Sequence, residues 1–191
     1  MLSNAERQAQ QKMQAKKTRR PIYSGRLITV ETLSYHFPGK EVTVDIVSHP
    51  GVVAILAIDD QGQLLLVRQF RNAIERILIE LPAGCLKPCE KAIACAQREL
   101  QEETGYRAAV LSHLTDLHSC PGFCNEVIHL FLAKGLSFDP LPPDEDEALD
   151  VLRLTPQQAI AMVHSGDITD AKTIAALFFY LTLPCEQKET L

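Results

Sequence analysis

The chain has 191 residues, of which 46% are hydrophobic and 23% are charged, and its 19 basic and 24 acidic residues give a formal net charge of −5. This composition is typical of a single folded globular domain and excludes a disordered, collagen-like or coiled-coil chain. The acidic balance argues against a protein that binds the nucleic-acid backbone through a basic surface. We therefore expect any anionic ligand to need a bridging cation.

The sequence contains no candidate membrane or secretory segment. No apolar run approaches the ~20 residues of a membrane span, and the polar start, MLSNAERQAQQKMQAKKTRR, lacks the apolar centre of a secretory signal. We expect a cytoplasmic protein with neither a membrane nor a nucleic-acid partner. The six cysteines are interpreted as free thiols, because the spacings Cys85-x3-Cys89 and Cys120-x3-Cys124 lack the C-x2-C knuckle of a zinc site.

The first 70 residues predict a polar arm followed by two hairpins. Residues 1–20 are rich in Gln, Ala and Lys and end in a basic cluster, so we expect a frayed helix or a disordered arm. Alternating β-branched residues predict a β-hairpin over 24–48, divided by Pro38-Gly39. The segments 52–58 and 63–70 predict a second hairpin, which is more continuously apolar and therefore more central.

The remainder of the chain predicts a mixture of strands and helices. The expected elements, in order, are a strand over 77–84, a helix over 90–104 that Gly105 ends, strands over 108–118 and 127–134, an acidic proline-rich loop over 139–147, a strand over 148–154, a helix from Thr155-Pro156 to Gly166 and a last helix that Asp170 opens. No internal repeat and no second domain are evident.

The helix predicted over 90–104 carries an unusual group of acids. At ~100° per residue, Ile93, Ala96 and Leu100 share one arc, which is expected to pack on the sheet. The adjoining arc contains three carboxylates, those of Glu99, Glu102 and Glu103. Arg98 can reach Glu102 at i+4, but one guanidinium cannot neutralise three carboxylates. Clustered hard oxygen ligands are what Mg²⁺ or Mn²⁺ requires, but most Glu-rich helices simply present a solvated acidic face, so both interpretations are open for the helix alone.

The full spacing around this helix is Gly84-x5-Glu90-x7-Arg98-Glu99-Leu100-x-Glu102-Glu103-x-Gly105-Tyr106. It resembles the Nudix box, Gx5Ex7REUxEExGU, at every fixed letter, with Tyr106 as a soft departure in the last apolar slot. The resemblance implies an α/β/α sandwich with a mixed sheet, preceded by an N-terminal β-hairpin. The expected divisions are an arm over 1–20, a Nudix hydrolase domain over 21–185 with a β segment over 21–48 and a catalytic core over 49–185, and a tail over 186–191.

The Nudix resemblance implies hydrolysis of a diphosphate by water with divalent cations, which suits the charge that develops in the loose transition state. Carried over by position, Glu99 and Glu103 would be the principal metal ligands, with Glu102 sharing the cluster and the carbonyl of Ala83 completing the shell. Arg98 would orient the carboxylates. Glu90 is expected on the opposite side of the helix, supporting its first turn rather than binding metal.

A second motif suggests which Nudix hydrolase this is. The segment Ser119-Cys120-Pro121-Gly122-Phe123-Cys124-Asn125-Glu126 resembles the SPGF-x-x-E signature of the ADP-ribose pyrophosphatase subgroup, and VRQFR, ELPAG and DITDAKTIAALFF agree with it. By that similarity, Arg71 would contact the diphosphate and Glu80 would face the terminal ribose. Pro121 would belong to the substrate-binding residues, and Glu126 would hold a metal water or the ribose.

Simpler interpretations of these residues stay open. Arg71 is also compatible with an unpaired strand-end surface residue, and Glu80 and Glu126 with solvated strand-edge acids. His118 and His129 are candidate bases, but a lone histidine on an apolar strand such as VIHLFLA is expected to be packed and satisfied rather than catalytic.

The general base is expected outside the box, because a carboxylate that binds metal is a poor proton acceptor. The acidic loop offers Glu147 and Glu145, and Glu147 is favoured because it resembles the family's catalytic glutamate just before a strand. The leading hypothesis is a homodimeric hydrolase that cleaves ADP-ribose to AMP and ribose 5-phosphate. Alternatives are a pyrophosphatase for another nucleoside diphosphate sugar, such as a GDP-sugar or ADP-glucose, and a Nudix module that senses a ligand without turnover.

Overall fold

The computed structural model describes residues 2–143 and 148–184. These residues form two compact units. The first contains the chain up to Pro50 together with Cys120–Glu126, and the second contains the rest of the chain from Gly51 onward. Each unit has its own β-sheet.

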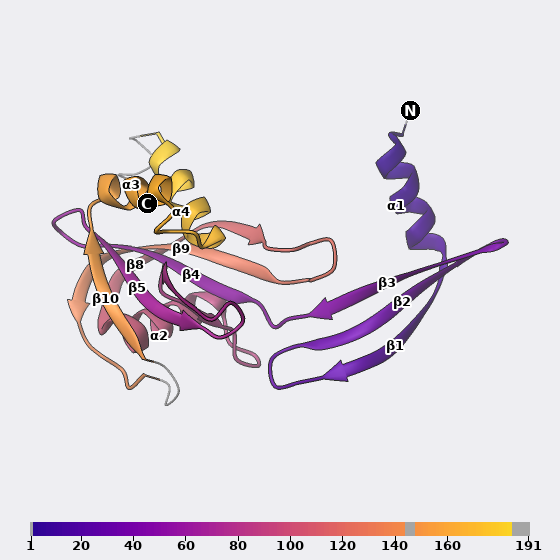
Figure 1. Cartoon of the computed structure of the whole chain (residues 1–191), viewed down its shortest axis with the longest axis horizontal. Coiled ribbons are helices and arrows are strands. Elements are labelled where there is room, and N and C mark those ends of the chain that lie inside the picture. Colours follow the sequence, from indigo (N-terminus) through magenta and orange to yellow (C-terminus); the bar gives the residue numbers. More distant parts are fainter. Residues whose placement is uncertain (1, 144–147, 185–191) are drawn as a thin grey trace. The chain divides into compact units, whose positions relative to one another are not determined.

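The first unit begins with helix α1 (Asn4–Gln14), which starts at a capping box formed by Ser3 and Glu6. None of the α1 residues is buried. Its sheet consists of three antiparallel strands among the described residues: β1 (Lys16–Ser24), β2 (Thr29–Phe37) and β3 (Lys40–Ser48). The predicted hairpin over 24–48 is therefore confirmed, and Figure 1 shows its strand β2 between β1 and β3.

The basic cluster of Lys16, Lys17, Arg19 and Arg20 lies in β1, not in a frayed or disordered arm, so the expectation for these residues was wrong. Backbone pairing with β2 makes this segment a strand, since Arg20 lies opposite Thr32 and Lys16 opposite His36. Every β1 residue is exposed, so the strand has no alternation of apolar residues that the sequence could reveal.

The second unit is built on a sheet of seven strands among the described residues. They are β4 (Val52–Ile58), β5 (Leu64–Arg71), β6 (Arg76–Glu80), β7 (Ala83–Cys85), β8 (Tyr106–His118), β9 (Val127–Phe138) and β10 (Leu149–Leu154). The main order is β10-β5-β4-β9-β8, with β6 paired to β5 and β7 to β4. Strands β4 and β9 are parallel and the other pairs are antiparallel, so the sheet is mixed as predicted.

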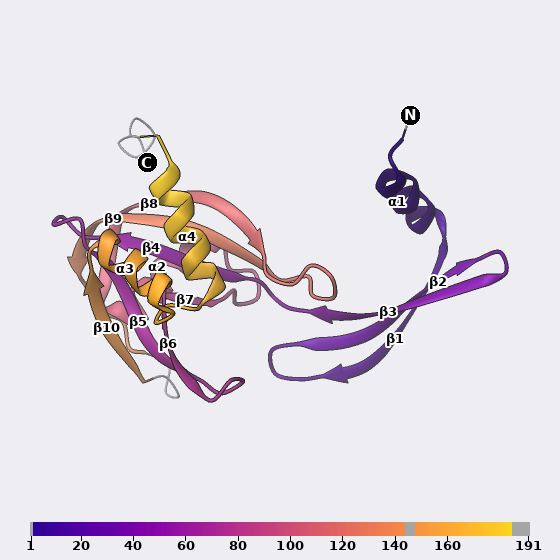
Figure 2. The same ribbon diagram turned by 45° about the horizontal axis from the view of Figure 1, so that its top comes forward.

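Helices cover both faces of this sheet, which confirms the predicted α/β/α sandwich (Figures 1 and 2). They are α2 (Ala92–Thr104), α3 (Pro156–Ser165) and α4 (Ala171–Thr182). On one face, Ala159 of α3 and Leu177 of α4 pack against Leu56 and Leu130 of the sheet. On the other face, Ala96 and Leu100 of α2 pack in a cluster that includes Ile55 and Phe131. The helix α2 is therefore anchored on the sheet by its apolar stripe.

The predicted ends of several elements need correction. Helix α2 begins at Ala92 rather than Glu90, and Ile93 is 50% exposed, so it is not part of the stripe on the sheet. Ile93 lies in the first turn of α2, where it faces the edge strand β8 instead of the centre of the sheet. The fully buried Cys95 belongs to the stripe on the sheet instead. The segment predicted as one strand over 77–84 is divided into β6 and β7 at Leu81-Pro82.

Candidate active site

The acidic residues of α2 face a strand that approaches them unusually closely. A Cβ atom at Gly84 of β7 would overlap the carboxyl carbon of Glu99. Glycine at this position therefore leaves room for the carboxylate between helix and strand. Glu99 and Glu103 are only 7% and 5% exposed, so both carboxylates lie at the buried border of the helix.

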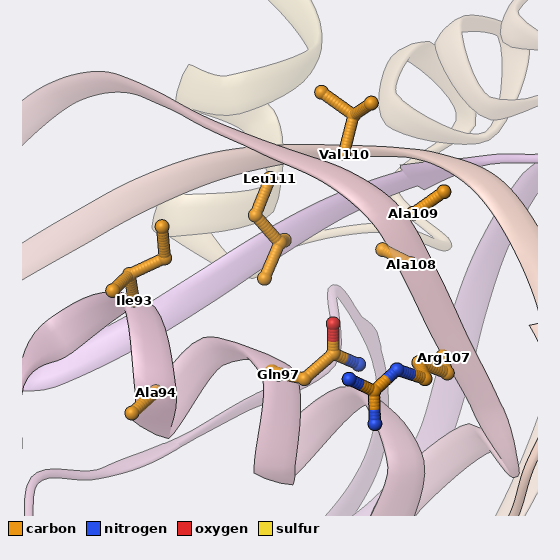
Figure 3. Close-up of a pocket in the computed structure, with 8 residues that line it drawn as sticks. All are labelled: Ile93, Ala94, Gln97, Arg107, Ala108, Ala109, Val110 and Leu111. Carbon is orange, nitrogen blue, oxygen red and sulfur yellow. The ribbon is translucent and has the colours of Figure 1, made fainter.

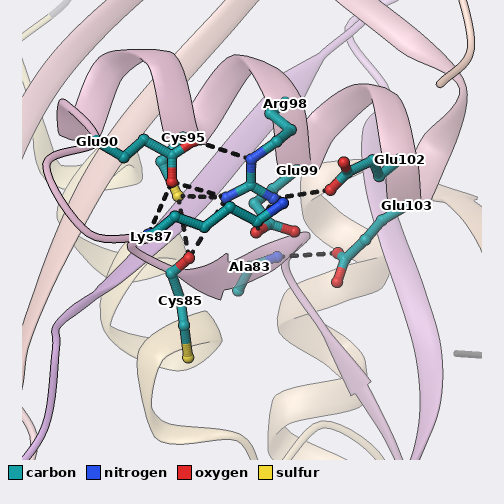
Figure 4. Close-up of polar contacts among 9 residues, drawn as sticks. All are labelled: Ala83, Cys85, Lys87, Glu90, Cys95, Arg98, Glu99, Glu102 and Glu103. Carbon is teal, nitrogen blue, oxygen red and sulfur yellow. Dashed lines mark hydrogen bonds and ion pairs between the residues drawn. The ribbon is translucent and has the colours of Figure 1, made fainter. Parts of the chain in front are cut away.

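Arg98 contacts three carboxylates at once (Figure 4). Its Nη1 donates to Glu99 Oε1 at 2.6 Å and to Glu102 Oε2 at 2.8 Å. Its Nε and Nη2 donate to the two oxygens of Glu90 at 2.8 and 2.9 Å. These ion pairs raise the pKa of Arg98, the hydrogen bonds to Glu90 being the largest cause, so the guanidinium stays charged. The geometry suits the orienting role expected of Arg98, which remains a prediction.

Glu90 does not support the first helical turn as the sequence suggested. It precedes the N-cap residue Lys91, outside the helix, and it folds back to accept hydrogen bonds from Arg98 and from the Lys87 backbone N–H at 2.9 Å. The hydrogen bonds from Arg98 outweigh the effect of burial and lower the pKa of Glu90 to about 2. Glu90 is thus an ionised anchor for Arg98, and its absence from the metal ligands stays a prediction.

Glu103 is tied to β7, since its Oε2 accepts a hydrogen bond of 2.9 Å from the backbone N–H of Ala83 (Figure 4). Ala83 is therefore beside the helix, as the prediction that its carbonyl completes a metal shell requires. The donor set of Glu99, Glu102, Glu103 and this carbonyl consists of hard oxygens only, which fits a divalent cation such as Mg²⁺. Within residues 2–143 and 148–184, however, the three carboxylates are not gathered within 4.8 Å of one another.

A cavity of about 420 Å³ opens next to two of these acids. It is lined by Glu102, Glu103, Pro143, Ala148, Leu149 and Asp150. The candidate bases Glu145 and Glu147 lie outside the described residues, and the residues on either side of them, Pro143 and Ala148, both line this cavity. The choice between the two glutamates stays a prediction.

Arg71 and Glu80 are joined to each other by a bidentate ion pair. Arg71 Nε and Nη2 donate to the two oxygens of Glu80 at 2.6 and 2.7 Å, and Lys172 at the start of α4 also donates to Glu80. Glu80 is 1% exposed, so it is not a solvated strand-edge acid. Burial alone raises the pKa of Glu80, but the hydrogen bonds from Arg71 and the charge of Lys172 outweigh it and lower the pKa.

Sequence reasoning missed Lys172 and its neighbour Asp170, which accepts a 3.0 Å hydrogen bond from Lys172 Nζ. Asp170 was recognised only as an N-cap, and it does cap α4 by accepting from the Thr173 N–H at 2.9 Å. The Lys172–Glu80 contact joins residues 92 positions apart, so no local pattern could have revealed it.

The segment that resembles SPGF-x-x-E is bound to β3 in the first unit. The Val47 N–H donates to the Phe123 carbonyl at 2.7 Å, and the Asn125 N–H donates to the Val47 carbonyl at 3.1 Å. Glu126 Oε1 lies 3.5 Å from His49 Nδ1, and the Glu126 side chain is only 21% exposed, so it is not a freely solvated acid. These contacts hold Pro121 and Glu126 in a fixed segment of that unit, and their part in substrate binding stays a prediction.

A second hollow, of about 490 Å³, lies between α2 and β8. Figure 3 shows Ile93, Gln97 and Arg107 around it, together with apolar residues of β8. Its lining contains no carboxylate, histidine or cysteine, so it offers no candidate for the hydrolytic chemistry. None of the five cysteines in the described part of the chain forms a disulfide. Burial raises the pKa of Cys95 to about 12, which makes that thiol unreactive.

Comparison with known proteins shows the class to which this fold and site belong. The model of the NUDIX domain family matches residues 47–177. The chain therefore belongs to the Nudix family of hydrolases. Nudix ADP-ribose pyrophosphatases generally depend on a divalent metal, in agreement with the oxygen donors described above. No described helix is long and apolar enough to cross a membrane.

Particular relatives narrow the class. The ADP-ribose pyrophosphatase of Bacillus subtilis is 42% identical over 82% of this chain and 86% of its own. The methanol dehydrogenase activator of Bacillus methanolicus is 38% identical over the same shares. The GDP-mannose pyrophosphatase of Salmonella paratyphi B is 35% identical over 69% of this chain and 73% of its own. A solved ADP compounds hydrolase superposes with a TM-score of 0.75 at 26% identity, covering 85% of this chain and 89% of its own.

Proposed function

We propose that this Nudix hydrolase cleaves the diphosphate of ADP-ribose with water and releases AMP and ribose 5-phosphate. The observation that carries the proposal is the buried acidic arc of α2, in which Arg98 holds Glu99 and Glu102 beside the closely packed Gly84. The 42% identity to an ADP-ribose pyrophosphatase over most of both chains supports the choice of substrate.

The metal in this proposal is Mg²⁺ or Mn²⁺, because both prefer the oxygen donors that Glu99, Glu102, Glu103 and the Ala83 carbonyl present. When bound, the ion neutralises diphosphate charge and lowers the pKa of a coordinated water. The chain's own contribution is to keep the donors in place: Arg98 fixes two carboxylates, Glu90 fixes Arg98, and the Ala83 N–H fixes Glu103.

Arg71 is proposed to bind the diphosphate. Its Nε and Nη2 donate to Glu80, and its Nη1 is proposed to donate to a phosphate oxygen, a contact that the planar guanidinium suits. Glu80 fixes the orientation of Arg71, and it is also proposed to face the terminal ribose. Pro121 and Glu126 are proposed to complete the substrate site, the latter by holding a metal water or the ribose.

Glu147 is proposed to accept the proton of the attacking water, with Glu145 as the alternative. The support for either is that the cavity beside Glu102 and Glu103 is lined by the residues that flank the 144–147 segment. The active form is proposed to be a cytoplasmic homodimer, as the resemblance to the subgroup suggested.

A second candidate substrate is a GDP-sugar, favoured by the 35% identity to a GDP-mannose pyrophosphatase. The test is kcat/KM for ADP-ribose, ADP-glucose and GDP-mannose under one metal concentration. We expect ADP-ribose to exceed both others by at least about 10-fold, the ratio that roughly 1.4 kcal/mol of differential binding supplies. A higher value for GDP-mannose would overturn the substrate assignment, and no turnover of any diphosphate would favour a sensing module.

A further inference from the structure

Three side chains with metal-binding atoms meet on the β8–β9 strand pair, away from the acidic arc of α2. His113 and Asp116 lie on β8, and His129 lies on β9. His113 Nε2 and His129 Nδ1 are each 2.7 Å from Asp116 Oδ1. In the described part of the chain, this is the one group of three or more histidine, cysteine, aspartate or glutamate donors whose ligand atoms all lie within 4.8 Å of one another.

A β-bulge brings the three side chains to the same face of the sheet. Residues three apart on a regular strand point to opposite faces, which would separate His113 from Asp116. The register of β8 against β9 shifts between His113 and Thr115, so that His113 lies opposite Phe131 and Asp116 lies opposite His129. Because His129 and Phe131 are two residues apart on β9, all these side chains share one face. The bulge thereby turns the His113 and Asp116 side chains to the same face of the sheet.

The surroundings of the cluster leave it open on one side and apolar on the other. The His113 ring packs edge-on against Phe131 at 5.5 Å between centroids, and Phe131 is 4% exposed within the core on the α2 face. The His113 and Asp116 side chains are about half exposed, and that of His129 is 26% exposed. A cation from solvent can therefore reach the three donors while the apolar neighbour limits where the His113 ring can move.

We propose that His113, Asp116 and His129 form a second metal site, which takes a borderline divalent ion of the Zn²⁺ class. Two imidazole nitrogens and one carboxylate oxygen are a donor set that such ions prefer, whereas Mg²⁺ prefers oxygen donors. Ligand bonds of about 2.0–2.2 Å in a tetrahedral arrangement place donors about 3.3–3.6 Å apart, so the groups now in contact at 2.7 Å would have to move apart by somewhat less than 1 Å. Three protein ligands leave further positions for water.

The site is independent of the proposed hydrolytic function, and its chemistry separates it from the acidic arc of α2. That arc offers only oxygen donors, so excess Mg²⁺ is expected to fill it without filling the histidine site. A Zn²⁺ ion at the second site would join β8 to β9 across the bulge and stabilise the folded state by preferential binding.

The test is calorimetric titration of the metal-free protein with ZnCl₂ in the presence of excess Mg²⁺. We expect the wild type to bind about one Zn²⁺ per chain. The affinity for Zn²⁺ should be at least 10-fold weaker in His129→Ala and in Asp116→Asn, because removing a ligand should weaken binding at least as much as removing a residue that only supports a ligand. Asp116→Asn keeps the shape of an exposed side chain, so it distinguishes a lost ligand from a failure to fold. His164→Ala, which removes an exposed histidine at the end of α3, is the matched control and is expected to bind as the wild type does.

Zinc also binds thiols, so a variant with Cys120→Ser and Cys124→Ser is titrated in parallel. Unchanged Zn²⁺ binding in this cysteine variant, together with loss of Zn²⁺ binding in Asp116→Asn, would support the site formed by His113, Asp116 and His129. Full binding in both His129→Ala and Asp116→Asn, or loss of binding in the cysteine variant alone, would overturn it. The absence of Zn²⁺ binding by the wild type would also overturn it, with no consequence for the proposed hydrolysis of ADP-ribose.

Discussion

Glu90→Gln should destabilise the protein even in the absence of metal. The neutral amide loses the charge that three hydrogen bonds stabilise, two from Arg98 and one from the Lys87 N–H. The drop in the Glu90 pKa from its ordinary 4.5 to about 2 corresponds to roughly 3 kcal/mol. Since the side chain borders solvent and is partly screened, we expect about 2 kcal/mol, equivalent to a fall in Tm of about 4–8 °C for a chain of this length.

The assay is thermal unfolding of the metal-free protein between pH 7 and pH 3, with Asp60→Asn in the exposed turn after β4 as the control for loss of one negative charge. Because the folded-state pKa of Glu90 is lowered, its contribution is complete above about pH 4.5 and is lost as the pH falls toward about 2. The Tm difference between wild type and Glu90→Gln should therefore be constant from pH 7 to 5 and narrow below. A Tm difference no larger than that of Asp60→Asn, or one that does not narrow in acid, would show that the Glu90–Arg98 ion pair does not stabilise the fold.

Three further predictions concern catalysis. Glu99→Gln and Glu103→Gln should each lower kcat/KM by at least about 10²-fold at saturating Mg²⁺, because each removes an oxygen donor worth several kcal/mol in the transition state. The far-UV circular dichroism should stay unchanged. Wild-type rates in either variant would remove that residue from the ligand set. Glu147→Gln should lower kcat by about 10²- to 10⁴-fold with little change in KM, and Glu145→Gln by much less, in steady-state assays; the opposite ranking would make Glu145 the base. Deletion of residues 2–15 should leave kcat unchanged, since α1 buries no residue, and a loss of activity would show that the helix has a part in the active form.

Much of the fold follows from local signals in the sequence. Gly105 ends α2 in a left-handed conformation, with φ of 78°, and Thr155 caps α3 with Pro156 in its first turn, both as predicted. The spacing of the box likewise predicted that Arg98 reaches Glu102, which it does at 2.8 Å. Each of these depends on residues within one or two turns of one another.

The features that sequence reasoning missed depend on distant parts of the chain. Strand β1 has no apolar alternation and exists because its backbone pairs with β2. The exposure of Ile93 depends on where the first turn of α2 lies over the sheet, which helical periodicity does not specify. The Lys172–Glu80 contact and the bulge beside His113 both require a partner strand or helix that is remote in sequence.

The most direct test of the central claim is product analysis after incubation of the purified protein with ADP-ribose and Mg²⁺. We expect AMP and ribose 5-phosphate in equal amounts, no products in the presence of excess chelator, and at least a 10²-fold slower release by Glu99→Gln. Turnover that persists without metal, products other than this pair, or equal rates in wild type and Glu99→Gln would contradict the assignment of the acidic arc of α2 as the hydrolytic site.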